Sequence, residues 1–226
     1  SSDVCSSDLA VSDVSFDLVA GEVTALIGPN GAGKTTLINL VTGVLACDGG
    51  TISLEGEDIT ARPTHQRGTA GIARTYQTPQ IAHGMSVLTN VMAGAYRFGQ
   101  HGLLSSVFRP WVVMKENDEM AARAAQCLTR AGVAEQWWQR LATDLPYGLQ
   151  RRVEIARSLA QDPKLLLLDE PAAGLDLAGR EDLVRQLTAL ATDEDAPALV
   201  LVTHHLEEVP PGFTHALLLR DGGVVA

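Results

Sequence analysis

Long apolar runs and cysteine are the scarcest features of this 226-residue sequence. It contains no run of about 18 apolar residues, so we expect no membrane-spanning helix, and no secretory leader is visible. The three cysteines, Cys5, Cys47 and Cys127, are scattered and lack the spacing of metal ligands. We therefore expect structural thiols in a reducing compartment, which fits the cytoplasm.

Positive charge is also scarce. Lys and Arg total 17 against 27 Asp and Glu, which gives a formal net charge of −10. A nucleic-acid-binding domain usually carries a basic patch or stripe, so this balance argues against nucleic acid as a partner. The length indicates one large domain, or one domain with a subdomain, and it suffices to bury a substantial core.

The most informative stretch is GPNGAGKTT at residues 28–36, which matches the phosphate-binding pattern G-x-x-x-x-G-K-[ST]. It follows an apolar run and precedes residues spaced like one face of a helix. Its glycines permit close approach of the backbone, and the N–H groups of the loop and helix favour anionic phosphate. Lys34 can reach the β- and γ-phosphates, and the Thr35 hydroxyl can ligate Mg²⁺. The expected phosphate-binding residues are Gly28, Pro29, Asn30, Gly31, Ala32, Gly33, Lys34, Thr35 and Thr36.

Alternating strand and helix patterns predict an α/β fold: a P-loop NTPase core with a mainly parallel sheet. A small antiparallel β subdomain and an inserted α-helical subdomain are also expected. The predicted strands span residues 11–18, 23–27, 51–54, 72–76, 165–168, 198–202 and 215–220. Predicted helices follow residue 36 and cover 86–95, the region around 120–128, 151–160 and the region around 183–190.

A second group of chemically competent residues is Asp169-Glu170, directly after the apolar run at 165–168. A carboxylate at the end of a strand that faces the P-loop can hold Mg²⁺, directly or through water. The second carboxylate can orient and deprotonate an attacking water. The alternative is an ordinary solvated acidic pair.

Together with four further motifs, these residues resemble the ATP-binding cassette (ABC) ATPases over about residues 10–226. LLLLDE at 165–170 is similar to the Walker B motif, and TYQ at 75–77 to the Q-loop. LPYGLQRR at 145–152 resembles the signature loop, AGLD at 173–176 the D-loop, and TH at 203–204 the switch histidine. This resemblance implies an ABC ATPase domain with its core at 10–77 and 149–226 and its helical subdomain at about 78–148. Residues 1–9, rich in Ser and Asp, are expected to be non-native or disordered.

The resemblance implies a role for each motif. Lys34, Gln77, Glu170 and His204 would form the catalytic set, with Glu170 as the base; His205 is the rival to His204. Metal ligands would be Thr35, Gln77 and Asp169. Tyr147 and Gly148 of the signature loop would cap ATP bound to an opposite subunit, and Asp176 would lie at the dimer interface.

Several positions depart from the family pattern. Pro146 replaces the usual signature serine, and Val4 and Cys5 stand where an adenine-stacking aromatic is expected. The tail stops soon after the last expected strand, which suggests truncation. These departures motivate one alternative, a non-catalytic truncated or chimeric nucleotide-binding fragment. A soluble ABC ATPase without a transport role is another.

GIARTYQ and YGLQRRVEIARSLA resemble the ATPases of branched-chain amino-acid importers and their amide or urea relatives. The resemblance implies hydrolysis of ATP with Mg²⁺ at a homo- or heterodimer interface. The implied partners are a second ABC ATPase subunit and a transmembrane permease, with no nucleic acid. The implied location is peripheral, on the cytoplasmic face of the cell membrane.

Overall fold

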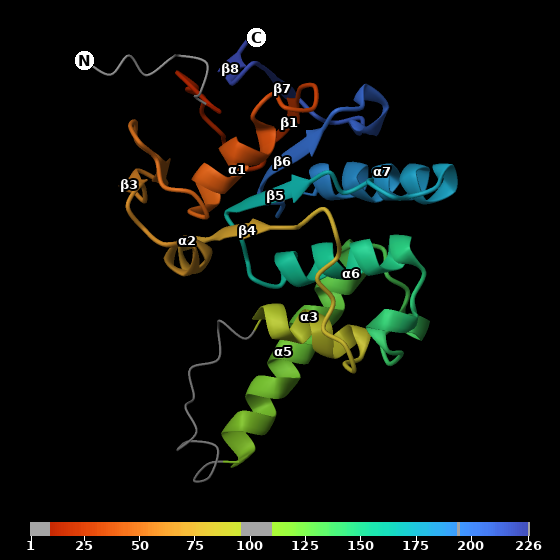
Figure 1. Cartoon of the computed structure of the whole chain (residues 1–226). Coiled ribbons are helices and arrows are strands. Elements are labelled where there is room, and N and C mark those ends of the chain that lie inside the picture. The colour runs from red at the N-terminus through yellow and green to blue at the C-terminus, as the bar shows by residue number, and fades with distance from the viewer. Residues whose placement is uncertain (1–9, 96–109, 194, 226) are drawn as a thin grey trace, which may run out of the picture.

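The computed structural model describes residues 10–95, 110–193 and 195–225. Within them, a six-stranded sheet has the order β4-β5-β6-β1-β7-β8, and β2 and β3 form a separate antiparallel pair (Figure 1). The first five strands in that order pair in parallel, and β8 is antiparallel to β7. The strands are β1 (Val23–Ile27), β2 (Ser53–Leu54), β3 (Glu57–Asp58), β4 (Ile72–Arg74), β5 (Leu165–Asp169), β6 (Ala198–Thr203), β7 (His215–Arg220) and β8 (Gly223–Val224). The predicted α/β fold is confirmed.

Helices cover both faces of the main sheet, and α3, α5 and α6 pack against one another on one side of it (Figure 1). The α-helices are α1 (Lys34–Thr42), α2 (Thr64–Ala70), α3 (Val87–Ala95), α5 (Pro110–Arg130), α6 (Tyr147–Leu159) and α7 (Leu177–Ala191). Three short 3₁₀ helices within the described residues are η3 (Glu135–Trp137), η4 (Ala142–Asp144) and η5 (Leu206–Glu208). The segment 78–148 therefore contributes α3 and α5. Among the described helices, none combines the length and apolarity needed to cross a bilayer.

The leucine run of β5 is buried on both of its faces, as its unbroken apolar sequence predicts. Leu166 and Leu168 join a core shared with α3, α5, α6 and α7. Leu165 and Leu167 point the other way, into a core shared with α1. Because alternate side chains of a strand leave opposite faces, one short run of leucines anchors both layers of the molecule.

One sequence prediction about secondary structure is wrong, one strand was not anticipated, and one helix begins earlier than predicted. No strand forms at 11–18: Asp13 has a φ of 52°, which interrupts the extended backbone, although Val11 and Leu18 still pack on the core. The predicted 215–220 strand is confirmed as β7, and the strand that was not anticipated is β8, which pairs with β7 after a turn at Asp221. The helix predicted from residue 151 begins at Tyr147, because apolar spacing alone does not register its first turn.

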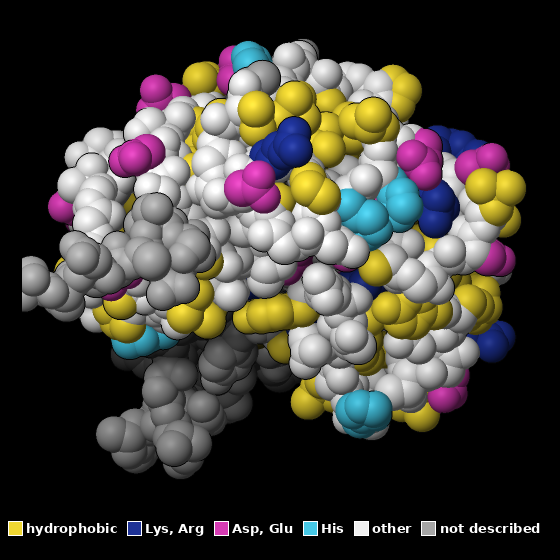
Figure 2. Space-filling view, turned by 45° about the horizontal axis from the view of Figure 1, so that its top comes forward, with side chains coloured by type: hydrophobic (Ala, Val, Ile, Leu, Met, Phe, Trp, Pro, Cys, Tyr) yellow, Lys and Arg dark blue, Asp and Glu magenta, His cyan; other side chains and the backbone are white. Residues whose placement is uncertain are grey.

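Charged side chains are dispersed over the face shown in Figure 2. Lys and Arg (dark blue) are separated from one another by uncharged and acidic surface, and no basic stripe crosses this face. This face therefore lacks the basic stripe that proteins usually use to bind the phosphate backbone of a nucleic acid.

Candidate functional site

The P-loop, residues 28–36, comprises the connection from β1 to α1 and the first residues of α1, at the carboxyl edge of the parallel sheet. Gly33 forms the N-cap of α1 with a φ of 98°, and a Cβ there would lie 2.5 Å from the Ala10 carbonyl oxygen. A Cβ on Gly28 would collide with the carbonyl of Leu219. The loop therefore requires glycine at both positions. With no side chain at the N-cap, the first N–H groups of α1 are left open to an anion.

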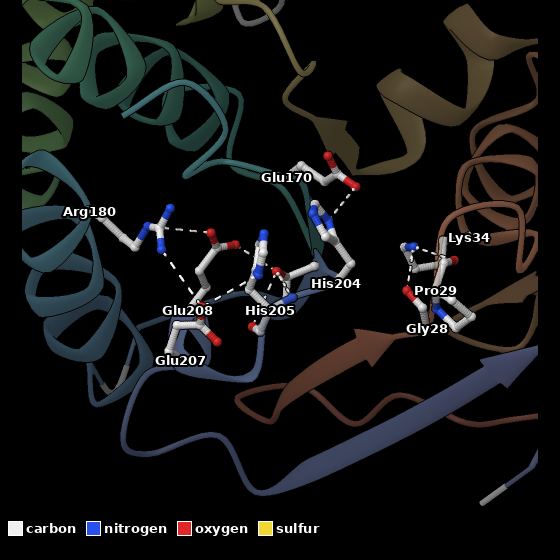
Figure 3. A network of polar contacts seen from close by, with 10 residues as sticks. Gly28, Pro29, Lys34, Glu170, Arg180, His204, His205, Glu207 and Glu208 are labelled. Carbon is white, nitrogen blue, oxygen red and sulfur yellow. Dashed lines mark hydrogen bonds and ion pairs between the residues drawn. The ribbon is translucent and has the colours of Figure 1, made fainter. Parts of the chain in front are cut away.

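Lys34 turns its ammonium group back over this loop. The Nζ donates to the carbonyl oxygens of Gly28, at 2.7 Å, and Pro29, at 3.0 Å, and the residue is 6% exposed (Figure 3). An ammonium has three donors, so one remains after these two bonds. The loop thus holds a buried positive charge beside the open N–H groups of α1.

Asp169 ends β5, which lies two strands from β1 in the sheet. The residue is 2% exposed, and its Oδ2 accepts a hydrogen bond from Arg74 Nη2 at 2.7 Å. The other nitrogen of the same fork, Nη1, donates to Asn39 Oδ1 on α1 at 2.6 Å. Oδ1 of Asp169 is buried without a hydrogen-bond partner in the described part of the chain. Sequence reasoning missed Arg74, which links β4 to β5 through Asp169 and to α1 through Asn39.

Glu170 follows in a left-handed backbone conformation, with a φ of 44°. Its N–H donates to the Val202 carbonyl of β6 at 3.0 Å, which fixes the turn. Its Oε1 lies 3.2 Å from Nδ1 of His204, the residue after β6 (Figure 3). Strained backbone of this kind is common where a side chain must be aimed. Of the two histidines, His204 is the one that contacts Glu170; His205 faces Glu207 at 3.4 Å.

Gln77 is exposed, three residues beyond the end of β4. The backbone around it is fixed by a buried ion pair on α6, Arg151 with Glu154. Arg151 donates to the Tyr76 carbonyl, and Glu154 Oε1 accepts from the N–H groups of Tyr76, at 3.2 Å, and Gln80, at 3.4 Å. The sequence signal for this arrangement was the pair of charged residues Arg151 and Glu154 within a helix. Their backbone partners near Gln77 lie more than 70 positions away in the chain, so local patterns did not reveal them.

A cavity of about 400 Å³ lies between the signature loop and the D-loop, the segments 145–152 and 173–176. Tyr147, Gly148 and Asp176 line it, so three predicted site residues meet here. None of the P-loop residues 28–36 does. The predicted nucleotide-contacting residues therefore lie in two separate places, the P-loop and this cavity.

Pro146 is the N-cap of α6 and supplies no side-chain acceptor to the helix. Gly148 consequently lies in the first turn of α6, where N–H groups have no partner within the helix. Asp176 caps α7, because its Oδ1 accepts from Gly179 N–H at 2.8 Å. This capping role explains an exposed aspartate locally, and the sequence analysis did not anticipate it.

A comparison with protein-family models matches residues 11–173 to the family described as ABC transporter. This chain belongs to the ABC transporter family. It is an ABC transporter ATP-binding subunit, and such subunits are ATPases. The predicted family is thereby confirmed.

Curated relatives of this ABC protein include the high-affinity branched-chain amino acid transport ATP-binding protein BraF of Pseudomonas aeruginosa. It is 34% identical over 96% of this chain and 85% of its own length. The corresponding protein LivG of Escherichia coli is 36% identical over 89% of this chain and 78% of its own length.

Solved structures agree. The chain resembles an ATP-binding cassette of an ABC transporter in its ADP conformation, with a TM-score of 0.79 and 33% identity, covering 96% of this chain and 84% of that one. It also resembles a dimeric cassette in a post-hydrolysis state bound to ADP and Pi. That likeness has a TM-score of 0.76 and 25% identity, and covers 96% of this chain and 89% of that one.

The residues present in this cassette fit a triphosphate and a divalent cation. The N–H groups at the start of α1, which no side chain caps, suit an anionic phosphate, and the buried, unpartnered Oδ1 of Asp169 is available for a positive charge. The Thr35 hydroxyl is exposed and makes no hydrogen bond within the described residues. With Gln77 these are oxygen donors, the ligand type that Mg²⁺ prefers.

Proposed function

We propose that this chain binds MgATP at the P-loop and hydrolyses it when two cassettes meet face to face. In this proposal Lys34 holds the β- and γ-phosphates, and Thr35, Asp169 and Gln77 hold Mg²⁺. The cation would neutralise charge on the phosphate oxygens. Glu170 would take a proton from the attacking water, and His204 would orient Glu170 and contact the γ-phosphate.

The observation that carries the proposal is the 3.2 Å contact between Glu170 and His204, beside the P-loop with its buried lysine. The signature-loop cavity is lined by no P-loop residue, so it supports a shared site. Tyr147, Gly148 and Asp176 would then act on nucleotide bound by the opposite subunit. Backbone N–H groups at the start of α6 would contact its phosphates in place of a serine hydroxyl.

We further propose that hydrolysis drives a transmembrane permease from the cytoplasmic face of the membrane. The cargo would be branched-chain amino acids or related amides, because BraF and LivG are named for that transport and cover most of this chain. The second cassette would be another copy or a paralogue.

The test is MgATP hydrolysis by the purified chain. Wild type should hydrolyse ATP only with Mg²⁺, and Glu170→Gln should lower kcat by about 10²–10⁴-fold because the general base is lost. Glu181→Gln, which neutralises an exposed carboxylate on α7, should match wild type. Equal rates for wild type and Glu170→Gln would contradict the proposal.

The transport proposal has its own experiment. Co-expressed with its permease, the wild-type chain should support uptake of labelled leucine, whereas Lys34→Ala should abolish it. Hydrolysis without uptake of any branched-chain amino acid or amide would contradict the cargo and leave the ATPase proposal standing.

A further inference from the structure

A buried carboxylate lies at the base of the turn that carries His204. Glu208, the last residue of η5, is 5% exposed. Its Oε2 accepts a hydrogen bond of 2.6 Å from Oγ1 of Thr203, the fully buried last residue of β6. A carboxylate is rarely buried to this extent unless it has partners. Glu208 therefore fixes the end of β6, one residue before His204.

The Thr203 hydroxyl also holds the backbone on the other side of His204. Its proton goes to Glu208, and its oxygen accepts the N–H of His205 at 3.0 Å. A hydroxyl has one proton, so donation to Glu208 leaves its lone pairs for His205. The backbone is thus tied on both sides of His204, whose ring meets Glu170.

Arg180 connects the same carboxylate to α7. Its Nε lies 3.6 Å from Glu208 Oε1, and its Nη1 lies 3.8 Å from Glu207 Oε1 (Figure 3). The Nε is buried and makes no hydrogen bond within the described residues, which leaves Glu208 as its nearest charged neighbour. Arg180 N–H donates to the carbonyl of Asp176 at 2.9 Å. Arg180 therefore lies in the first turn of the helix that Asp176 caps.

We propose that Arg180 and Glu208 form a positioning pair that couples the D-loop to the switch histidine. The path runs through Asp176, Arg180, Glu208, Thr203, His204 and Glu170. A partner cassette that sets the position of Asp176 sets the first turn of α7, and with it Arg180. Neither member of the pair belongs to the P-loop, so the pair acts on turnover and not on nucleotide affinity. The inference rests on the proposed catalytic roles of His204 and Glu170.

The experiment compares Arg180→Gln, Glu208→Gln and the double variant with Arg185→Gln. Arg185 is the matched control, because it pairs with Asp182 on the same helix at 2.8 Å with both side chains largely exposed. Each single network variant should lower kcat about tenfold with KM for MgATP within about twofold of wild type, the pattern of a lost transition-state interaction. The kcat of the double variant should be no lower than that of the slower single variant, because coupled residues act as one unit.

Two further measurements separate positioning from folding. Arg180→Lys keeps the charge and should recover about half of the lost kcat, since a point charge replaces the guanidinium fork. The His204 imidazole ¹⁵N resonances, assigned with His204→Gln, should shift in Glu208→Gln and stay in place in Arg185→Gln. Thermal unfolding identifies variants that fail to fold.

Additive losses in the double variant, a KM that rises as kcat falls, or unshifted His204 resonances would overturn the coupling. A wild type that hydrolyses MgATP while both single variants match Arg185→Gln removes only this inference. A wild type without MgATP hydrolysis removes the proposed function as well.

Discussion

His204 Nδ1 lies 3.2 Å from Glu170 Oε1, whereas the adjacent His205 faces Glu207. The two imidazole rings are only 3.9 Å apart between centroids, so neither sequence position nor general proximity distinguishes them. Their carboxylate partners do. Glu170 begins the turn after β5, and Glu207 lies in η5.

Replacing each of these histidines by alanine tests which one takes part in hydrolysis. His204→Ala should lower kcat by about 10²-fold or more, because the partner that orients the general base is removed. His205→Ala should stay within about threefold of wild type, since it removes an exposed pair with Glu207 and a ring contact with His204 but no contact with Glu170. Steady-state hydrolysis of MgATP measures both. A larger loss in His205→Ala would assign the role to the second histidine.

Glycine at position 28 is required by the fold of the loop as well as by its ligand. Gly28→Ala forces a Cβ against the Leu219 carbonyl and should lower the free energy of unfolding by about 1–3 kcal/mol. Gly49→Ala is the control, because nothing lies within 4 Å of the added carbon. Urea unfolding without nucleotide measures the two. Identical unfolding free energies would show that the loop can move away.

Arg74 and Asp169 form a buried ion pair. Mg²⁺ bound near Asp169 should make this pair less important for the stability of the chain. Arg74→Met leaves Asp169 without its partner and should destabilise the nucleotide-free chain by about 3–5 kcal/mol. The rise in Tm on addition of MgATP should then exceed that of wild type, because the cation supplies the missing positive charge.

Arg62→Met is the control for this variant. It breaks an ion pair with the exposed Glu57 and should cost at most about 1 kcal/mol, with a wild-type response to MgATP. Equal Tm rises in Arg74→Met and wild type would argue against Asp169 as a neighbour of the metal.

The carboxyl of Glu154 gives the fold a pH dependence. Burial raises its pKa above the ordinary value of 4.5, against the lowering effect of its hydrogen bonds with the backbone of Tyr76 and Gln80 and of the Arg151 charge. The folded state therefore holds this proton to higher pH than the unfolded state does. The stabilisation it provides is complete below about pH 4.5 and is lost as pH rises through the folded pKa.

Glu154→Gln removes that dependence. The unfolding free energy of wild type, relative to Glu154→Gln, should fall as the pH is raised from about 4.5 toward neutrality. Urea unfolding of both proteins across that range measures the difference. Parallel stability curves would show that Glu154 has no raised pKa in the folded chain.

The sequence predicted what depends on local spacing. The P-loop, the buried run of β5 and the carboxylates after it follow from patterns within a few residues. The strand at 11–18 was wrong because alternating Val and Leu indicate burial, while Asp13 turns the backbone to positive φ. Apolar spacing also registered α6 four residues too late, because its first turn lacks the periodic residues.

Contacts between distant segments were not predictable from local patterns. Arg74 meets Asp169 across 95 positions, and Arg151 meets the Tyr76 carbonyl across 75. Each of these arginines looks like a solvated charge in its own segment. Only the packing of β4 beside β5 and of α6 beneath both shows that these side chains are buried and paired.

Complementation between two inactive variants tests the shared site most directly. Lys34→Ala removes the P-loop lysine and keeps the signature loop, whereas Gly148→Asp does the reverse. Each should be inactive alone, and their mixture should regain MgATP hydrolysis, because a mixed dimer contains one intact P-loop opposite one intact signature loop. If Gly148→Asp alone hydrolyses MgATP at the wild-type rate, or the mixture remains as inactive as its components, the account of a site built from two cassettes is contradicted.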